Sequence, residues 1–145
     1  MKLYIAADHA GYSLKEALKL RLGELGMVPT DLGSATLVEG DDYTTVAHAL
    51  AAEVTKDSEA RGILICDTGT GMSMAANRHP GIRAVSTADD WTVTRAREHE
   101  DANVLCLGAR FVSVAEAYEL VRDFLATPFT GEERHIRRIK ELDIQ

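Results

Sequence analysis

The 145-residue sequence is poor in the residues that mark specialised classes of protein. It contains 2 cysteines, 3 prolines and 11 glycines, and aromatic side chains make up 6% of it. This composition excludes collagen-like, low-complexity and disordered chains. The 23 Asp and Glu residues outnumber the 16 Lys and Arg residues, so the net charge is −7. That balance argues against a protein that neutralises nucleic-acid phosphates over a broad surface, and any positively charged site must be local.

Signal-peptide patterns and apolar runs of bilayer length are also missing from the sequence. Both cysteines, Cys66 and Cys106, lie inside apolar segments of an acidic chain. We therefore expect a reduced, cytoplasmic setting and neither a membrane nor a nucleic-acid partner. A chain of this length buries roughly two thirds of its unfolded surface, which is enough for one core, so we expect a single domain over residues 1–145.

Apolar β-type segments alternate with amphipathic helical segments along the whole chain. The expected strands are 2–7, 27–32, 62–66, 83–87 and 103–107. The expected helices are 13–25, 42–56, 71–77, 90–100, 113–126 and 132–142. Ser13 is available as the N-cap of the first helix, with Glu16 three residues later. Right-handed crossovers between strands covered on both faces predict an α/β fold, a Rossmann-like doubly wound sandwich with a five-stranded parallel sheet.

In such sheets ligands bind beyond the carboxyl ends of the strands, which directs attention to the residues there. Asp8 and His9 follow the first strand, where they either face a ligand or cap the next helix. The third strand ends at Cys66, and the glycine-containing turn 67–71 leads into a helix. Such a turn directs backbone N–H groups at an anion and suits a phosphate or an enediolate. No Gly-Lys-Ser/Thr closes it, so it is not a Walker loop.

The two thiols have different surroundings in the sequence. Cys66 stands at a strand end, where a helix N-terminus favours a usable base or nucleophile, although an inert buried thiol is the alternative. The adjacent Asp67 disfavours a thiolate unless it points away or is paired. Cys106 lies within a wholly apolar strand and is interpreted as an inert core thiol.

Basic side chains cluster near two helix ends. His99 falls in the last turn of a helix, which favours its protonated form, and a solvated surface histidine is the alternative. Arg134 and Arg138 are four residues apart and share one helix face. Paired guanidinium groups suit a phosphate monoester, whereas ion pairs within a solvated helix are the alternative.

Several short segments in order carry a family resemblance. They are Ala7-Asp8-His9-Ala10-Gly11, Asp42-Tyr43, Gly62-Ile63-Leu64-Ile65-Cys66, Thr68-Gly69, Gly71, Ala75-Ala76-Asn77, Gly81-Ile82-Arg83-Ala84, Asn103-Val104-Leu105, Gly108-Ala109-Arg110 and Arg134-His135. With these, nearly the whole chain resembles the ribose-5-phosphate isomerase B family, which includes galactose-6-phosphate isomerase subunits. The resemblance implies a Rossmann-like domain that forms homodimers or homotetramers with shared active sites, a sugar-phosphate substrate, and neither cofactor nor metal. It also implies that the basic helix 132–142 packs on the partner subunit.

The same resemblance implies roles for individual residues in an aldose–ketose isomerisation, with ribose 5-phosphate and ribulose 5-phosphate as the first substrates to test. Cys66 would be the base that moves a proton between C2 and C1 through a cis-enediolate, assisted by Thr68. His99, with Asp8, would open the furanose ring. Backbone N–H groups at Asp67, Gly69 and Gly71 would stabilise the enediolate, Tyr43 would line the sugar pocket, and His9, Arg110, Arg134 and Arg138 would hold the phosphate.

Two positions depart from the common pattern of that family. Asp67 stands where glycine usually follows the cysteine, and Glu100 stands where asparagine usually follows the histidine. Both add negative charge near the reacting end of the substrate, so we hypothesise that they tune which sugar phosphate is accepted. The alternatives are isomerisation of a tetrose or hexose phosphate, such as erythrose 4-phosphate, allose 6-phosphate or galactose 6-phosphate, and a non-catalytic phosphate-binding subunit. Convergence of Cys66, Thr68, Asp8 and His99 on one strand edge would favour an enzyme.

Overall fold

The computed structural model describes residues 1–144 and contains one parallel sheet. Its strands are β1 (Leu3–Ala7), β2 (Thr30–Asp31), β3 (Arg61–Cys66), β4 (Ala84–Ser86) and β5 (Val104–Gly108). The spatial order is β2-β1-β3-β5-β4, and every neighbouring pair is parallel. The predicted α/β fold with a five-stranded parallel sheet is therefore confirmed.

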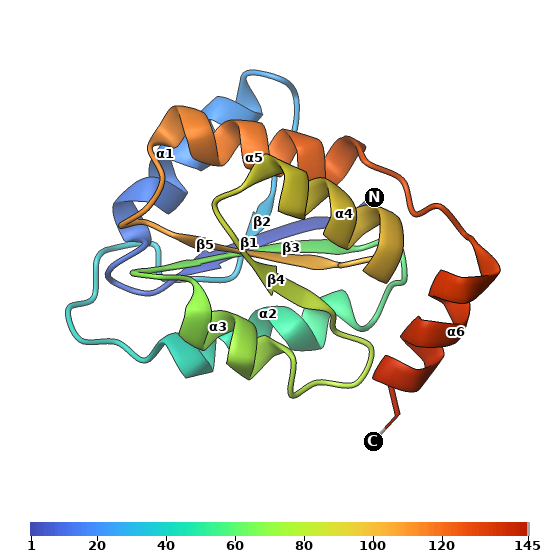
Figure 1. The fold of residues 1–145 in the computed structure, drawn as a ribbon. Coiled ribbons are helices and arrows are strands. Elements are labelled where there is room, and N and C mark those ends of the chain that lie inside the picture. The colour runs from blue at the N-terminus through green and yellow to red at the C-terminus, as the bar shows by residue number, and fades with distance from the viewer. Residues whose placement is uncertain (145) are drawn as a thin grey trace.

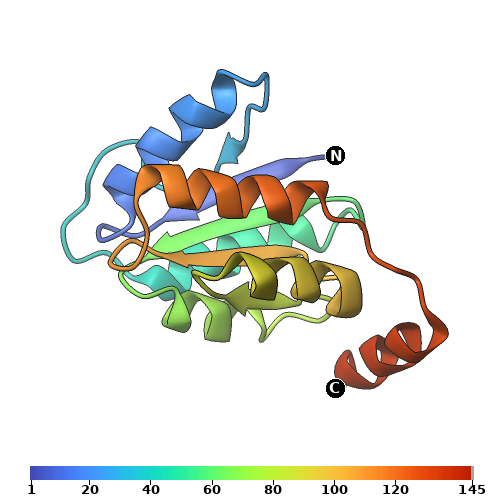
Figure 2. The ribbon, with the colours of Figure 1, turned by 45° about the horizontal axis from the view of Figure 1, so that its top comes forward.

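Helices cover both faces of this sheet. They are α1 (Tyr12–Gly23), α2 (Tyr43–Val54), α3 (Thr70–Ala76), α4 (Asp90–Glu100), α5 (Val114–Ala126) and α6 (Glu133–Leu142). In Figure 1, α1, α4 and α5 lie on one face, and α2 and α3 lie on the other. Helix α6 contacts α4 and, as Figure 2 shows, stands off from the sheet at the end of an extended segment. No helix within residues 1–144 has the length and apolar character needed to cross a membrane.

Alternating side chains of the central strands divide the core into two layers. Ile63 and Ile65 pack with α1, α4 and α5, whereas Leu64 and Cys66 pack with α2 and α3. Both layers are apolar, which is why the buried positions of the central strands are apolar. The strand alternation places the Cys66 side chain on the α2–α3 face, at the carboxyl end of β3.

Two expected element boundaries were wrong. The predicted strand 27–32 is reduced to Thr30–Asp31, because Gly26 turns with φ +75° and Pro29 has no N–H to donate to a ladder. The first helix begins at Tyr12 with Gly11 as its N-cap, so Ser13 does not cap it. Asp8 Oδ1 instead accepts a hydrogen bond from the Gly11 N–H at 3.1 Å.

Candidate active site

Cys66 forms the floor of a tight turn at the carboxyl end of β3. Its side chain is 6% exposed, and its Sγ accepts a hydrogen bond from the Gly69 N–H at 3.1 Å. Gly69 has φ +79°, a left-handed conformation that glycine adopts without strain. A Cβ there would lie 2.7 Å from Ser86 Oγ, so the turn needs glycine for space as well. The turn holds the sulfur in place beside the Gly69 N–H.

Cys106 occupies a different environment on the neighbouring strand. It is fully buried within β5, and burial raises the pKa of its thiol far above the ordinary value. It therefore stays protonated at neutral pH, as expected of an inert core cysteine.

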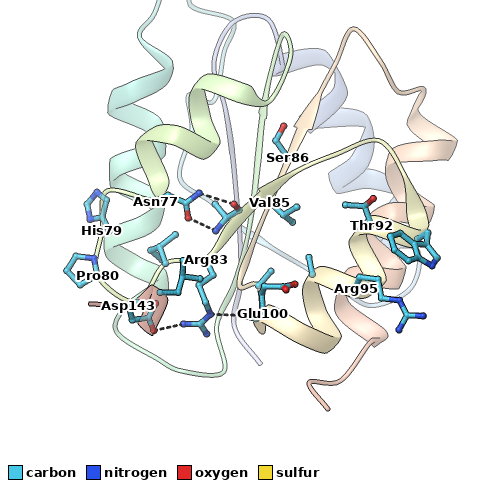
Figure 3. A pocket seen from close by; sticks show the side chains of 17 residues that line it. Asn77, His79, Pro80, Arg83, Val85, Ser86, Thr92, Arg95, Glu100 and Asp143 are labelled. Carbon is cyan, nitrogen blue, oxygen red and sulfur yellow. Dashed lines mark hydrogen bonds and ion pairs between the residues drawn. The ribbon is translucent and has the colours of Figure 1, made fainter. Parts of the chain in front are cut away.

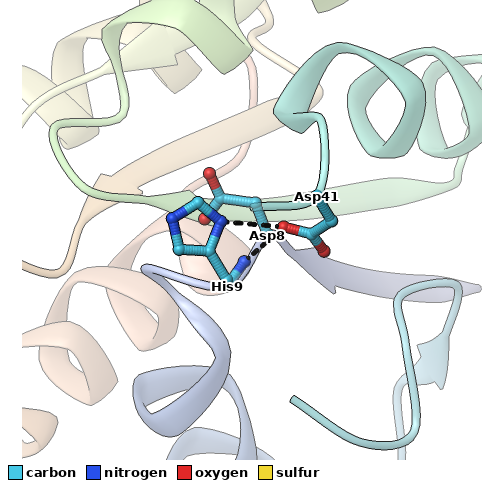
Figure 4. Close-up of side chains that lie close together, drawn as sticks. All are labelled: Asp8, His9 and Asp41. Carbon is cyan, nitrogen blue, oxygen red and sulfur yellow. Dashed lines mark hydrogen bonds and ion pairs between the residues drawn. The ribbon is translucent and has the colours of Figure 1, made fainter. Parts of the chain in front are cut away.

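Asp8 and His9 meet a third side chain, Asp41, beside the same sheet edge (Figure 4). Asp41 Oδ1 accepts a hydrogen bond from the His9 backbone N–H at 2.7 Å and lies 2.9 Å from His9 Nδ1. The hydrogen bond with Asp41 raises the pKa of His9, and the nearby negative charges add to the effect. Burial raises the pKa of Asp8, which is 6% exposed. This cluster favours a protonated His9.

Sequence reasoning missed Asp41. It stands beside Asp42, directly before a helix, where acidic residues usually serve as caps. Among residues 1–144, Asp8, His9 and Asp41 are the one group of three such side chains whose ligand atoms lie within 4.8 Å of one another, a spacing that could hold a metal ion. The two contacts between His9 and Asp41 hold the group together without one.

Tyr43 and Thr68 flank the turn. A Cβ added to Gly71 would lie 2.8 Å from Tyr43 Cε2, so the tyrosine ring lies against the turn backbone. The Thr68 side chain is half-buried, and its carbonyl group packs on Gly108 of β5. Cys66, Asp8, His9, Tyr43 and Thr68 are thus grouped at the carboxyl edge of the sheet.

Asp67 and Arg110 form an ion pair over this edge. Asp67 Oδ2 lies 3.2 Å from Arg110 Nε and 3.1 Å from its Nη2, and both side chains are more than half exposed. The backbone N–H of Arg110 also donates to the Asp67 carbonyl at 3.0 Å. The Asp67 carboxylate is therefore paired with a guanidinium. A paired carboxylate disfavours negative charge on the neighbouring Cys66 sulfur less than a free one would.

The remaining predicted site residues lie at the opposite, amino edge of the sheet. Helix α4 runs back from the end of β4, so its last turn, with His99 and Glu100, returns to where the strands begin. Arg83, directly before β4, donates from Nε to the Glu100 carbonyl at 2.8 Å. Within one chain the structure thus separates His99 from Cys66, Thr68 and Asp8, and this separation follows from the topology. Its physical cause is that a crossover helix is antiparallel to the strands it joins.

Helix α6 brings two further predicted residues to the His99 side of the molecule. The ring of His135 stacks on the ring of His99, with centroids 4.3 Å apart and planes 11° from parallel. Arg134 pairs with Glu132 at 2.8 Å, whereas Arg138 makes no ion pair among residues 1–144. Both arginines are exposed, and neither reaches the Cys66 turn of its own chain.

A cavity of about 540 Å³ runs along β4, the open edge of the sheet (Figure 3). Glu100 and Arg83 line it, together with Trp91, whose side chain is 64% exposed. Figure 3 shows Arg83 bonded to the backbone of Glu100 and to Asp143. The cavity does not include the Cys66 turn. Glu100 thus belongs to the open sheet edge and not to the group around Cys66.

Comparison with known proteins places this arrangement in a family. Residues 3–142 match the family model described as Ribose/Galactose Isomerase. Ribose-5-phosphate isomerase B of Mycobacterium tuberculosis is 37% identical over 139 residues, which cover 96% of this chain and 86% of the relative.

Solved structures agree with the sequence comparison. Ribose-5-phosphate isomerase B from Mycoplasma genitalium with bound ribulose-5-phosphate aligns with a TM-score of 0.92 and 40% identity, covering 98% of this chain and 93% of that one. The enzyme from Thermotoga maritima gives a TM-score of 0.92 and 40% identity over 98% and 97% of the two chains. The chain therefore belongs to the ribose/galactose isomerase family.

Proposed function

We propose that the protein is an aldose–ketose isomerase of sugar phosphates that interconverts ribose 5-phosphate and ribulose 5-phosphate, with Cys66 as the base. The observation that carries the proposal is the buried Cys66 sulfur, held by the Gly69 N–H at the carboxyl edge of the sheet, where ligands bind in such folds. Family membership supports it, as does the 40% identity to a structure that holds ribulose-5-phosphate.

The chemistry needs only proton transfers. Cys66 Sγ takes the proton from C2 of the open-chain aldose, which leaves a cis-enediolate, and returns a proton to C1. The Thr68 hydroxyl moves the proton between the oxygens on C1 and C2. Backbone N–H groups at Asp67, Gly69 and Gly71 stabilise the negative oxygen, and such fixed donors do not depend on side-chain type. Because no electrons leave the sugar, the reaction calls for no redox cofactor.

In the proposed mechanism, His99 and Asp8 transfer the protons that open the furanose ring. These two side chains lie at opposite edges of the sheet in one chain. We therefore propose a homodimer in which α4 and α6 of a second copy supply His99 to the Cys66 turn. The open β4 edge with its exposed Trp91 supports this arrangement, and so does the largely exposed helix α6.

The substrate phosphate would meet a set of cationic side chains in that dimer. The hydrogen bond with Asp41 raises the pKa of His9 and so favours its charged form, and Arg134 and Arg138 would arrive from the second copy. Arg110 is also expected to bind the phosphate, but in this structure its guanidinium is paired with Asp67. A phosphate dianion would have to compete with the Asp67 carboxylate for this guanidinium.

This ion pair favours a second candidate, in which the preferred substrate is another sugar phosphate. While Arg110 is paired with Asp67, it is not available to the substrate phosphate. The phosphate would then bind elsewhere in the site, and a sugar of another chain length would fit better. The test is turnover of ribose 5-phosphate, allose 6-phosphate, galactose 6-phosphate and erythrose 4-phosphate by the unmodified protein and by Asp67→Gly with Glu100→Asn. A changed order of preference supports a specificity role for these residues, and an unchanged order excludes it.

The experiment that tests the main proposal compares the two thiols. We expect Cys66→Ala to lower kcat for ribose 5-phosphate by about 100-fold or more, the scale of a general base, with little change in the affinity for a sugar-phosphate ligand. Cys106→Ala, one strand away, is the matched control and should keep kcat within a few fold. Equal loss of turnover and affinity in Cys66→Ala would assign the thiol a structural role.

A further inference from the structure

The face-to-face pair of His99 and His135 joins α6 to α4. His135 is 3% exposed and is the one buried residue of α6. Its ring covers that of His99, which belongs to α4 and is half-buried. The neighbouring α6 residues, such as Ile136 and Arg138, are exposed. Apart from the half-buried Ile139, α6 thus buries one flat ring, which lies against one imidazole.

The Nε2 side of the His135 ring is not used for a hydrogen bond. Its Nε2 is buried and has no hydrogen-bond partner among residues 1–144, and the Glu132 carboxylate is 4.0 Å away. A buried ring nitrogen without a hydrogen-bond partner costs free energy of folding. The favourable contact of the His135 side chain is therefore the stacking of its ring face on His99.

The stacked arrangement also allows His99 to gain and lose a proton. The titratable groups around His135 are His99 on α4 and Glu132, Arg134 and Arg138 beside it on α6. Burial lowers the pKa of His135, and the positive neighbours lower it further. A neutral ring can lie against His99 in either protonation state, whereas two charged imidazoles 4.3 Å apart would repel each other.

We propose that His135 is a positioning residue for ring opening: its ring fixes the plane of the His99 imidazole and thereby aims the His99 ring nitrogen at the furanose oxygen. This inference rests on the proposed function, in which His99 transfers the proton that opens the ring. It assigns His135 no contact with the substrate. A flat ring without nitrogen should therefore serve almost as well as the histidine.

The test separates ring opening from proton transfer at carbon. Conversion of ribose 5-phosphate requires both, because the aldose is supplied as a furanose. Exchange of a C1 hydrogen of ribulose 5-phosphate for deuterium in D₂O requires only the second, because this ketose has its C5 oxygen blocked by phosphate and stays open-chain. Both rates are measured on the intact protein, the second by NMR.

We expect His135→Ala to lower kcat for ribose 5-phosphate by about 10- to 100-fold, the scale expected when a catalytic group is misplaced by about 1 Å. Deuterium exchange into ribulose 5-phosphate should stay within about threefold of the unmodified rate, since this step belongs to Cys66. His135→Phe should recover most of the lost turnover. His79→Ala is the matched control, because His79 pairs with His48 at 2.8 Å on another surface, and it should change neither rate.

Three results would overturn the inference. Parallel loss of conversion and exchange in His135→Ala would show a general structural role, and retention of both would show no role. Failure of His135→Phe to recover turnover, with a melting curve like that of the unmodified protein, would assign the work to the ring nitrogen. If the unmodified protein catalyses neither reaction, the proposed isomerase function itself fails, which is a distinct outcome.

Discussion

Gly108→Ala tests whether the position of the Thr68 turn controls turnover. Gly108 ends β5, and a Cβ there would lie 2.7 Å from the Thr68 carbonyl oxygen and 2.8 Å from the carbonyl carbon. An ordinary contact begins near 3.4 Å, so the Thr68 backbone must withdraw by about 0.7 Å. Backbone, unlike a side-chain tip, cannot rotate out of the way. The substitution therefore moves the turn that carries Thr68 and holds Cys66.

The substitution is expected to lower both stability and activity. Overpacking of this kind costs about 1–3 kcal/mol of the free energy of unfolding, measured by urea titration. A displacement approaching 1 Å at reacting groups lowers kcat by up to about 100-fold, so we expect a loss of about 10- to 100-fold for ribose 5-phosphate. The assay is ketose formation at saturating substrate, at a temperature where the variant is fully folded.

Two other glycines provide matched controls. Gly62→Ala overpacks the far end of β3, where the new Cβ overlaps Leu50 Cδ2, and should lose stability while it keeps kcat within a few fold. Gly23→Ala has nothing within 4 Å and should be neutral or slightly stabilising. If Gly108→Ala keeps full kcat, or if Gly62→Ala loses as much, the reasoning that ties turnover to the placement of this turn is refuted.

Two further predictions concern charged pairs. Asp41→Asn should lower the pKa of His9 toward its ordinary value, because the hydrogen bond with the carboxylate raises it. The fraction of His9 that is charged above about pH 6.5 would then fall. An NMR titration of the ring protons would show this change, and an unchanged titration would contradict the assignment. Asp31→Ala removes the carboxylate 2.8 Å from Lys15, which is 0% exposed, and leaves it the Glu16 carboxylate at 3.3 Å, so the loss in urea unfolding should exceed about 1 kcal/mol and approach about 3–5 kcal/mol. Glu53→Ala, which breaks an exposed pair with Lys56, should cost under about 1 kcal/mol, and equal losses would refute the role of burial.

The order of strands and helices was readable from the sequence because hydrophobic periodicity is a strong local signal. Helix boundaries depended on tertiary contacts that the local pattern does not contain. The pattern Ser-x-x-Glu occurs at Ser13 and again at Ser113, and only Ser113 forms a capping box, with Glu116. At the first position a different contact decides, since Gly11 lies directly against the Ile65 carbonyl group and the helix begins there.

The grouping of the candidate residues in space was predictable from the sequence where it depends on one strand end, and not where it depends on two chain segments meeting. Cys66, Thr68 and Tyr43 gather around one turn because the turn itself brings them together. Asp41 escaped notice because its partner, His9, is 32 residues away in the sequence. The pairing of Asp67 with Arg110 likewise joins two loops that no local pattern links.

The separation of His99 from Cys66 was available from topology alone. In a parallel sheet the strand ends that bind ligands lie at one edge, and every crossover helix ends at the other. A histidine in the last turn of α4 therefore cannot reach a thiol at the end of β3 within one chain. If both groups act on one substrate, two chains must meet, with the amino edge of one set against the carboxyl edge of the other. Under the proposed mechanism assembly is thus a chemical requirement, since a lone chain has the base for isomerisation but not the acid for ring opening.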